Sequence, residues 1–341
     1  MAIPTTLTAD LRHILTHSED LWEELRGQRI FMTGGTGFFG CWLLEAFCAA
    51  NRELGLNARV SVLSRDPKRF AAKAGHLADD SAVDFVAGEL NSFDFPTGNF
   101  LHVIHAALNY LAPLTLFVDA ISATRRMLEF AVRCEARGFL FISSGAVYGR
   151  QPPELTHVPE DYIGAPITTD LRSSYGEAKR GSEFLCAAFH AEHGLQTKIA
   201  RGFAFVGPYL PLDLNFAIGN FVRDALKGDI INVNGDGTPR RSYLYGADLA
   251  IWLWRILLRG APSRPYNVGG EADVSIAQLA KIVRDEVNPR AEVHFAQEAD
   301  PGEAAERYVP STGRARSELG LEEWIDLRDG IRRMGEWNRS L

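Results

Sequence analysis

The sequence is poor in cysteine and has no long apolar run. Among its 341 residues are four cysteines, too far apart to form a Cys-x-x-Cys pair: Cys41, Cys48, Cys134 and Cys186. Thiols scattered in this way are typical of buried side chains in a reducing compartment. No stretch reaches the roughly 18 apolar residues of a membrane-spanning helix, and no secretory signal peptide is recognisable. These absences predict a cytoplasmic protein that does not enter a membrane.

An excess of positive charge and a metal-ligand spacing are also missing. The formal net charge of −7 argues against nucleic acid or an anionic membrane as a main partner. The nine histidines show no metal-binding spacing, so no metal is predicted, and His102 and His105 are expected to pack. A hydrophobic content of 46% is ordinary for a globular protein, and the length allows one large domain or two moderate ones.

The most informative stretch is rich in glycine and runs from Arg29 to Ala46. A short apolar run ends at Thr33, and Gly34-x-x-Gly37-x-x-Gly40 leads into an apolar, helix-favouring segment. Glycine allows a sharp turn and a close approach to a ligand, and a helix N-terminus offers free N–H groups to a phosphate. The segment therefore predicts a strand, a turn and a helix that together bind a dinucleotide.

Further apolar runs alternate with helical segments along the chain. Strands are predicted at 59–63, 83–87, 101–104, 138–143 and 198–200, and long helices at 117–133 and 175–192. This alternation predicts an α/β fold, a Rossmann-type doubly wound parallel sheet whose ligands bind at the carboxyl ends of the strands. Its predicted boundaries are 29–205 with 236–266. An N-terminal helical extension precedes it (1–28), and a smaller α/β substrate-binding cap is expected from 206–235 and 267–341.

The end of the second predicted strand bears on the choice of cofactor. A carboxylate there binds the adenosine ribose of NAD, whereas an arginine accommodates the 2′-phosphate of NADP. Ser64 and Arg65 hold these positions, and the acid, Asp66, comes one residue later. The segment favours NADP(H), with NAD(H) as the alternative.

A second motif can supply acid–base chemistry. Tyr175 and Lys179 are four residues apart on a predicted helix and therefore share a face. A lysine ammonium near a phenol stabilises the phenolate, which can then remove a hydroxyl proton while hydride leaves the same carbon. Ser144, at the end of a neighbouring strand, can orient the reacting oxygen. These three residues are the predicted catalytic group.

The motifs together resemble the extended short-chain dehydrogenase/reductase family of nucleotide-sugar epimerases and dehydratases, over about residues 29 to 330. Its order of motifs is matched by TGGTGFFG at 33–40, HAA at 105–107, SSGAVYG at 143–149, YGEAK at 175–179, GDGTPRRSYLY at 235–245 and YNVGG at 266–270. The resemblance implies an NAD(P)-dependent enzyme with Tyr175 as base, Lys179 as its partner and Ser144 as the third catalytic residue.

The resemblance also implies binding residues. The cofactor would contact Gly34, Gly37, Phe38, Phe39, Gly40, Ser64, Arg65, Glu89, Leu90, Ala106, Ala107, Ser143, Tyr175 and Lys179. The substrate, a nucleoside-diphosphate sugar, would contact Ser144, Asn215, Arg241, Tyr245 and Arg307. Arginine suits the diphosphate because its guanidinium pairs with two phosphate oxygens.

One departure from the family pattern carries information. Dehydratases of this family have Thr-Asp-Glu or Thr-Ser-Glu where this chain has Ser144-Gly145-Ala146. Eliminating water needs that extra acid and base, which Ala146 cannot supply. Only Glu160, Asp161 or Asp170, from the loop 150–172, could replace it.

Several functions remain open at this stage. The leading one is epimerisation of a nucleoside-diphosphate sugar through a transient 4-keto intermediate. Next come an NADPH-dependent reductase of a 4-keto-6-deoxy sugar, which Arg65 favours, and a uronic acid decarboxylase, for which Arg240 or Arg201 could bind the carboxylate. A flavonoid-type reductase and a non-catalytic Rossmann protein fit less well. The resemblance also implies a homodimer formed through the helices at 117–133 and 176–192, whose apolar residues could serve that seam or the sheet: Met127, Phe130, Phe184, Leu185 and Phe189.

Overall fold

The computed structural model describes residues 4–109, 111–228, 230–300, 302 and 304–341. The chain divides into two compact units. The first comprises Met1–Gly149, Gly164–Gly202 and Ala250–Tyr266, and the second Arg150–Ile163, Phe203–Leu249 and Asn267–Leu341. These limits differ from the predicted boundaries, because 150–163 and 236–249 belong to the second unit. The first three residues of the predicted extension lie outside the described residues.

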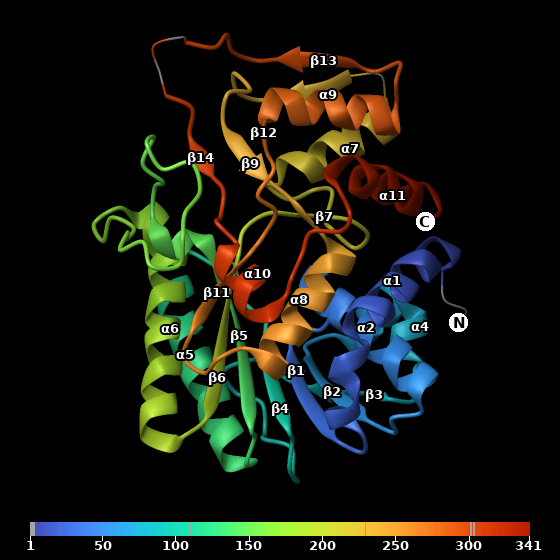
Figure 1. Cartoon of the computed structure of the whole chain (residues 1–341), viewed down its shortest axis with the longest axis vertical. Coiled ribbons are helices and arrows are strands. Elements are labelled where there is room, and N and C mark those ends of the chain that lie inside the picture. Colours follow the sequence, from blue (N-terminus) through green and yellow to red (C-terminus); the bar gives the residue numbers. More distant parts are fainter. Residues whose placement is uncertain (1–3, 110, 229, 301, 303) are drawn as a thin grey trace. The chain divides into compact units, whose positions relative to one another are not determined.

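A seven-stranded sheet has the order β11-β6-β5-β4-β1-β2-β3 (Figure 1). Its strands are β1 (Arg29–Thr33), β2 (Arg59–Ser64), β3 (Val83–Ala87), β4 (His102–His105), β5 (Gly138–Ser144), β6 (Gln196–Gly202) and β11 (Pro265–Val268). Neighbouring strands from β6 to β3 pair in parallel. The order reverses between β1 and β4, and in a doubly wound sheet the carboxyl ends of the strands at this point are where a ligand is expected to bind. The predicted α/β fold is confirmed.

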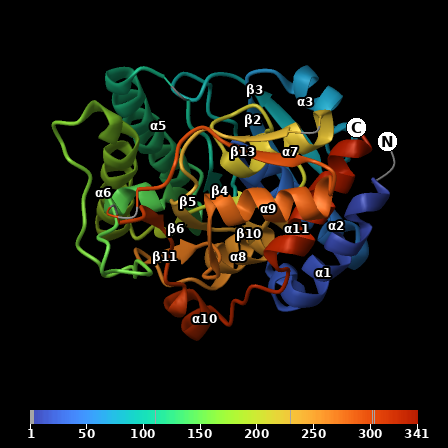
Figure 2. The same cartoon turned by 90° about the horizontal axis from the view of Figure 1, so that it is seen from above.

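Helices cover both faces of this sheet. They are α2 (Phe38–Leu54), α3 (Pro67–Lys73), α4 (Gly75–Ala78), α5 (Pro113–Arg133), α6 (Ser174–His193) and most of α8 (Gly246–Arg259), with short 3₁₀ turns η3 (Gly145–Tyr148) and η4 (Leu171–Ser173). Helices α5 and α6 run side by side (Figure 2) and bury Met127, Phe130 and Cys186 in one core with Phe139 and Phe141 of β5. On the opposite face, Trp254 of α8 donates a hydrogen bond to the Leu43 carbonyl of α2.

The N-terminal extension packs within the first unit. It consists of η1 (Thr5–Leu7), α1 (Thr8–Ser18) and η2 (Glu19–Leu25). Trp22 is fully buried, and its ring lies 5.3 Å from that of Trp254. Asp20 forms an ion pair of 2.7 Å with Arg255. The extension therefore belongs to the hydrophobic core of this unit.

In its described residues, the second unit combines short strands with four helices. Its elements are β7 (Phe205–Val206), α7 (Ala217–Lys227), β8 (Ile230–Val233), β9 (Arg240–Ser242), β10 (Leu244–Tyr245), β12 (Asp273–Ser275), α9 (Ile276–Val287), β13 (Glu292–Phe295), β14 (Arg307–Tyr308), α10 (Gly313–Leu319) and α11 (Leu327–Arg339). The strands form three small sheets, β10-β7, β12-β9-β14 and β13-β8. Helix α9 packs against both α7 and α11.

The cysteines are free and buried, as predicted. Burial raises the pKa of the Cys41 thiol to about 12, so this side chain is a poor nucleophile. None of the helices in the described part of the chain has the length and apolarity to cross a bilayer.

Candidate functional site

The glycine segment forms the predicted strand, turn and helix. Gly34 follows β1 with a φ of 75°, and a Cβ atom there would lie 2.6 Å from the Ala106 carbonyl carbon. At Gly40 a Cβ atom would lie 2.3 Å from the Gly34 carbonyl oxygen. Both positions therefore require glycine. Gly37 caps α2, whose first turn has no acidic residue and includes Phe38 and Phe39. The cradle fits the pyrophosphate of a dinucleotide.

The segment after β4 closes beside this cradle. The backbone N–H of Ala106 donates to the Thr33 carbonyl, and that of Ala107 donates to Thr33 Oγ1. Thr33 Oγ1 lies 2.8 Å from Nδ1 of His105, whose Nε2 lies 3.4 Å from Thr124 Oγ1 of α5. Burial lowers the pKa of His105 to about 3, so its imidazole stays neutral. The predicted packing role of His105 is confirmed.

The end of β2 has a basic rather than an acidic character. Ser64 is buried, and its Oγ accepts the backbone N–H of Asp66. The Asp66 carboxylate accepts the backbone N–H of Arg69 and so caps α3. Arg65 is exposed between them. The acid is therefore engaged in a helix cap, while the guanidinium of Arg65 faces solvent.

The residues predicted after β3 have different surroundings. Glu89 is exposed, and its backbone carbonyl accepts hydrogen bonds from the backbone of Ser92 and Phe93. Leu90 is partly buried against the hydrophobic core of the first unit. Both stand at the carboxyl end of a strand, as predicted.

The predicted catalytic residues lie at the carboxyl end of β5 and the start of α6. Ser144 is the last residue of β5, and its Oγ accepts the backbone N–H of Ala146 at 3.1 Å. The Lys179 Nζ atom lies 5.9 Å from the centre of the Tyr175 ring and donates to the Ile142 carbonyl at 2.7 Å. Lys179 thus lies beside Tyr175. It also binds β5 at Ile142, which precedes Ser144 by two residues.

Electrostatics at this end of the sheet suit proton transfer. Lys179 is buried, and burial lowers the pKa of its ammonium to about 8. A buried cation beside a phenol favours the phenolate. Tyr175 itself packs against Leu116 and Ala120 of α5, which hold its ring in place.

The second unit contains a cavity of about 450 Å³. Its lining includes Asn215, Asn220, Asn232, Asn234, Asp236 and Arg241. Two residues predicted to bind substrate, Asn215 and Arg241, therefore share one cavity. Asn220, Asn232 and Asn234 also line the cavity but were not predicted from the sequence, because isolated asparagines do not differ there from those of surface loops.

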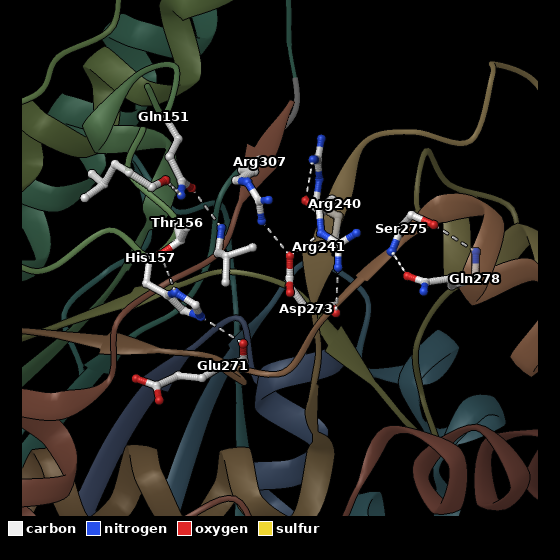
Figure 3. Close-up of polar contacts among 12 residues, drawn as sticks. Gln151, Thr156, His157, Arg240, Arg241, Glu271, Asp273, Ser275, Gln278 and Arg307 are labelled. Carbon is white, nitrogen blue, oxygen red and sulfur yellow. Dashed lines mark hydrogen bonds and ion pairs between the residues drawn. The ribbon is translucent and has the colours of Figure 1, made fainter. Parts of the chain in front are cut away.

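Ion pairs engage the arginines around β9, and Figure 3 shows Arg240 and Arg307 beside Asp273. Arg241 Nη2 lies 2.7 Å from Glu306 Oε1. Arg307 Nη1 lies 2.7 Å from Asp273 Oδ2, and Arg240 Nε binds the same carboxylate oxygen. The hydrogen bond from Arg240 is the main reason why the pKa of Asp273 is lowered. Arg307 is thus held by a carboxylate of its own unit, and its predicted contact with substrate stays a prediction.

Tyr245 has a structural setting different from the one expected. Its side chain is fully buried and does not line the cavity. Cβ atoms built on Gly207 and Gly330 would each lie 3.0 Å from its ring, and Arg333 lies over the ring at 5.6 Å. The ring therefore serves the packing of the second unit.

Two of the three acids that could replace the missing dehydratase residue are engaged elsewhere. Glu160 is buried, accepts the backbone N–H of Asn267 and lies 3.9 Å from Arg314. Asp170 caps η4 and pairs with Arg172 at 2.8 Å. Both carboxylates are thus engaged with partners of their own.

A comparison with known protein families identifies the family of the chain. A model of the NAD dependent epimerase/dehydratase family matches residues 30–269. The chain belongs to this family. The resemblance drawn from the motifs is thus confirmed, as is the prediction of an NAD(P)-dependent enzyme of the epimerase/dehydratase type.

Similar proteins with assigned names include plant enzymes. UDP-glucuronic acid decarboxylase 5 of Arabidopsis thaliana is 33% identical over 224 residues, which are 66% of this chain and 64% of that protein. UDP-glucuronic acid decarboxylase 4 of the same plant is 33% identical over 309 residues, 89% of this chain and 67% of that protein. The chain spans less than two thirds of the length of the first of these relatives.

Solved structures of this family share the fold. A UDP-glucuronic acid 4-epimerase from Bacillus cereus in complex with UDP-glucuronic acid and NAD has a TM-score of 0.76 and 21% identity, covering 92% of this chain and 99% of that one. A dTDP-glucose 4,6-dehydratase from Streptomyces venezuelae has a TM-score of 0.76 and 22% identity, covering 91% and 97%. Enzymes that share this fold therefore catalyse different reactions.

Proposed function

We propose that the protein acts on a nucleoside-diphosphate sugar, and that its reaction is epimerisation through a transient 4-keto intermediate. The observation that carries the proposal is the buried ammonium of Lys179 beside Tyr175, at the strand end that presents Ser144. These residues belong to the same unit as the glycine cradle. Hydroxyl oxidation needs a base, a group that orients the oxygen and a bound hydride acceptor.

The roles of the chain's own residues follow from this arrangement. Tyr175, ionised with the help of Lys179, removes the proton of the sugar 4-hydroxyl, and Ser144 orients that oxygen. A nicotinamide coenzyme, when bound in the glycine cradle, supplies the hydride acceptor and donor. After rotation of the keto sugar, Tyr175 returns the proton to the same oxygen, and carbon 4 then has the inverted configuration.

The substrate side of the proposal rests on the cavity of the second unit. Arg241 lines it together with Asn215 and several asparagines. The lining also includes Asp236 and the ion pair of Arg223 with Asp224. The guanidinium of Arg241 suits a diphosphate, and the amide side chains suit the polar edge of a nucleotide base. Arg241 is therefore assigned to the diphosphate.

A second candidate reaction is decarboxylation of a nucleoside-diphosphate uronic acid. The plant relatives named as UDP-glucuronic acid decarboxylases favour it. Oxidation of a uronic acid at carbon 4 gives a β-keto acid, which can lose carbon dioxide, so both reactions share their first step. Arg201 and Arg240, predicted as partners for the carboxylate, already pair with Glu183 and Asp273. This pairing supports epimerisation.

The remaining two reactions differ in how far the site supports them. A dehydratase lacks support because Ala146 replaces the acid and Glu160 and Asp170 are engaged. A reductase of a 4-keto sugar uses the same three catalytic residues once and is favoured by Arg65.

The cofactor is NADP(H) or NAD(H), and the segment after β2 favours NADP(H). Arg65 is exposed there, while Asp66 is engaged as a helix cap. The NAD bound in structures of similar fold supports the alternative.

A homodimer is proposed through the outer face of α5 and α6. Leu114, Val118 and Phe184 on these helices are 77%, 50% and 73% exposed. A second copy of the chain would cover these apolar side chains. Met127 and Phe130 instead lie in the core. Sedimentation should give a dimer for the wild type and a monomer for Phe184→Glu; a monomeric wild type at micromolar concentration would contradict this assignment.

The test of the reaction is a product panel followed by proton NMR. The protein is incubated with UDP-glucuronic acid, UDP-glucose or a dTDP-sugar, each with NAD⁺ or NADP⁺. The proposal expects one of them to give its 4-epimer without net reduction of the coenzyme, and Tyr175→Phe to give none. A UDP-pentose and carbon dioxide would establish the decarboxylase instead, and net consumption of NADPH with a 4-keto sugar the reductase.

A further inference from the structure

A buried ion pair lies one helical turn beyond the catalytic lysine. Glu183 follows Lys179 by four residues on α6, so the two side chains share a face of the helix. Glu183 and Arg201 of β6 are only 12% and 14% exposed in their side chains. Arg201 binds the carboxylate as a fork, with Nη2–Oε2 at 2.7 Å and Nε–Oε1 at 3.0 Å. Burying two charges is costly, so such a pair calls for a reason other than stability.

The same carboxylate ties α6 to the end of β5. Ser143 Oγ donates to Glu183 Oε1 at 2.5 Å, and Ser143 stands directly opposite Arg201 in the register of β5 and β6. The preceding residue, Ile142, receives the hydrogen bond from Lys179 at 2.7 Å. Two consecutive residues of β5 are therefore held by two consecutive turns of α6. The next residue of β5 is Ser144, so these contacts set its position relative to the helix that carries Tyr175.

Arg201 holds the far side of the same segment. Its Nη1 donates to the Tyr148 hydroxyl oxygen at 2.8 Å, and its guanidinium carbon lies 4.8 Å from the centre of the Tyr148 ring. Tyr148 ends η3, the turn that follows Ser144. The pair thus fixes the segment that bears the catalytic serine at both of its ends.

Charge gives Glu183 a second effect. Lys179 is buried, and burial lowers the pKa of its ammonium whereas the charge of Glu183 raises it. The titratable groups that act on Lys179 are Glu183 and Cys186 of α6, and Lys179 in turn acts on His105 of β4. Cys186 keeps its proton because burial raises the pKa of its thiol, and His105 is neutral. While the neighbouring Tyr175 keeps its proton, Glu183 is therefore the anion among these groups that acts on this lysine.

We propose that Glu183 is a positioning residue of the reaction: it aligns the end of β5 with α6 through Ser143, and it supplies the countercharge that retains the proton on Lys179. Arg201 keeps Glu183 in place. The inference rests on the proposed function, because it matters for catalysis only if Tyr175 and Lys179 do the chemistry.

The first experiment follows the ionisation of Lys179 itself and needs no substrate. The chain has six lysines, so their ¹³Cε signals can be resolved and that of Lys179 assigned by its loss in Lys179→Met. In Glu183→Gln, which removes the charge but keeps an oxygen for Ser143, the titration midpoint of Lys179 should fall by about one pH unit or more. Glu192→Gln, an exposed carboxylate on the same helix, is the matched control and should change nothing. An unchanged midpoint in folded Glu183→Gln overturns the countercharge.

Two further variants separate charge from alignment. Glu183→Asp keeps the charge on a shorter side chain. Its Lys179 midpoint should therefore lie closer to the wild-type value than that of Glu183→Gln, while its kcat stays low. At saturating coenzyme, so that a lost coenzyme contact of Ser143 does not limit the rate, Ser143→Ala should lower kcat at least tenfold with the Lys179 midpoint unchanged. Wild-type kcat in both variants overturns the alignment, and these variants decide it even if Glu183→Gln does not fold. A shifted midpoint in Glu183→Gln with undiminished turnover would instead count against the roles proposed for Tyr175 and Lys179.

Discussion

The Nζ atom of Lys179 lies 2.7 Å from the carbonyl oxygen of Ile142. This hydrogen bond ties the helix that carries Tyr175 to the strand that ends at Ser144. A buried ammonium that donates to a backbone carbonyl keeps one position, so it acts on the neighbouring phenol as a fixed charge rather than a mobile one. Four of the expectations that follow from this site and its surroundings can be measured separately.

Removing the phenol hydroxyl should abolish proton transfer while leaving the fold intact. Tyr175→Phe is expected to lower kcat by about 10²- to 10⁴-fold, the usual contribution of a general base. Because its ring still packs against Leu116 and Ala120, the unfolding midpoint should stay close to that of the wild type. Turnover at saturating coenzyme and thermal unfolding check these two points, and undiminished turnover would refute the tyrosine mechanism.

Nucleotide binding should strengthen when the partner of Arg241 loses its charge. Glu306 pairs with Arg241 at 2.7 Å but is 53% exposed, so the pair contributes at most about 1 kcal/mol. Glu306→Gln should therefore bind UDP up to about fivefold more tightly at low salt, by calorimetry. Glu298→Gln, an exposed carboxylate in the preceding segment, is the control. Weaker binding in Glu306→Gln would show that Glu306 helps the nucleotide rather than competing with it.

The choice of coenzyme should depend on Arg65. Arg65→Ala is expected to weaken NADPH binding by about tenfold, the size of a charge-assisted hydrogen bond to a phosphate, and to leave NADH binding unchanged. Fluorescence titration with both coenzymes measures the ratio. Arg69→Ala, an exposed arginine on α3, serves as the control. Equal losses for both coenzymes would contradict the assignment of Arg65 to the 2′-phosphate.

Acid should destabilise the fold through its buried histidines. Burial lowers the pKa of His102 to about 3 from 6.5, so below pH 6.5 the unfolded chain takes up a proton that the folded chain does not. Stability contributed by the neutral imidazole is complete above pH 6.5 and falls by about 1.4 kcal/mol per pH unit as the pH drops toward 3.

A variant of His102 isolates this effect. The two ring nitrogens of His102 have no hydrogen-bond partner among the described residues, so His102→Leu loses no hydrogen bond. Between pH 8 and pH 5, its unfolding free energy in urea should decline by about 2 kcal/mol less than that of the wild type. The exposed His294→Gln should follow the wild type. Parallel pH dependences of wild type and His102→Leu would refute the account.

The sequence allowed most of the first unit to be predicted. Glycines with no room for a Cβ atom, such as Gly34 and Gly40, and the i,i+4 pair Tyr175 and Lys179 are local signals that survive without a structure. The pairing of Glu183 with Arg201 could not be predicted, because it depends on how α6 packs against β6. Tyr245 shows the reverse case. It stands in a family motif, but its ring is buried in the second unit, and only tertiary packing decides that.

The most direct test of the account is a substrate labelled with deuterium at carbon 4 of the sugar. The sugar nucleotide that the product panel identifies as substrate, labelled in this way, is turned over with the bound coenzyme, and rate and product are followed by NMR and mass spectrometry. The account predicts a primary isotope effect on turnover, deuterium retained at carbon 4 of the inverted product, and loss of both conversion and isotope effect in Tyr175→Phe. A sugar nucleotide that is turned over without an isotope effect, or with deuterium exchanged for solvent hydrogen at carbon 4, would contradict it.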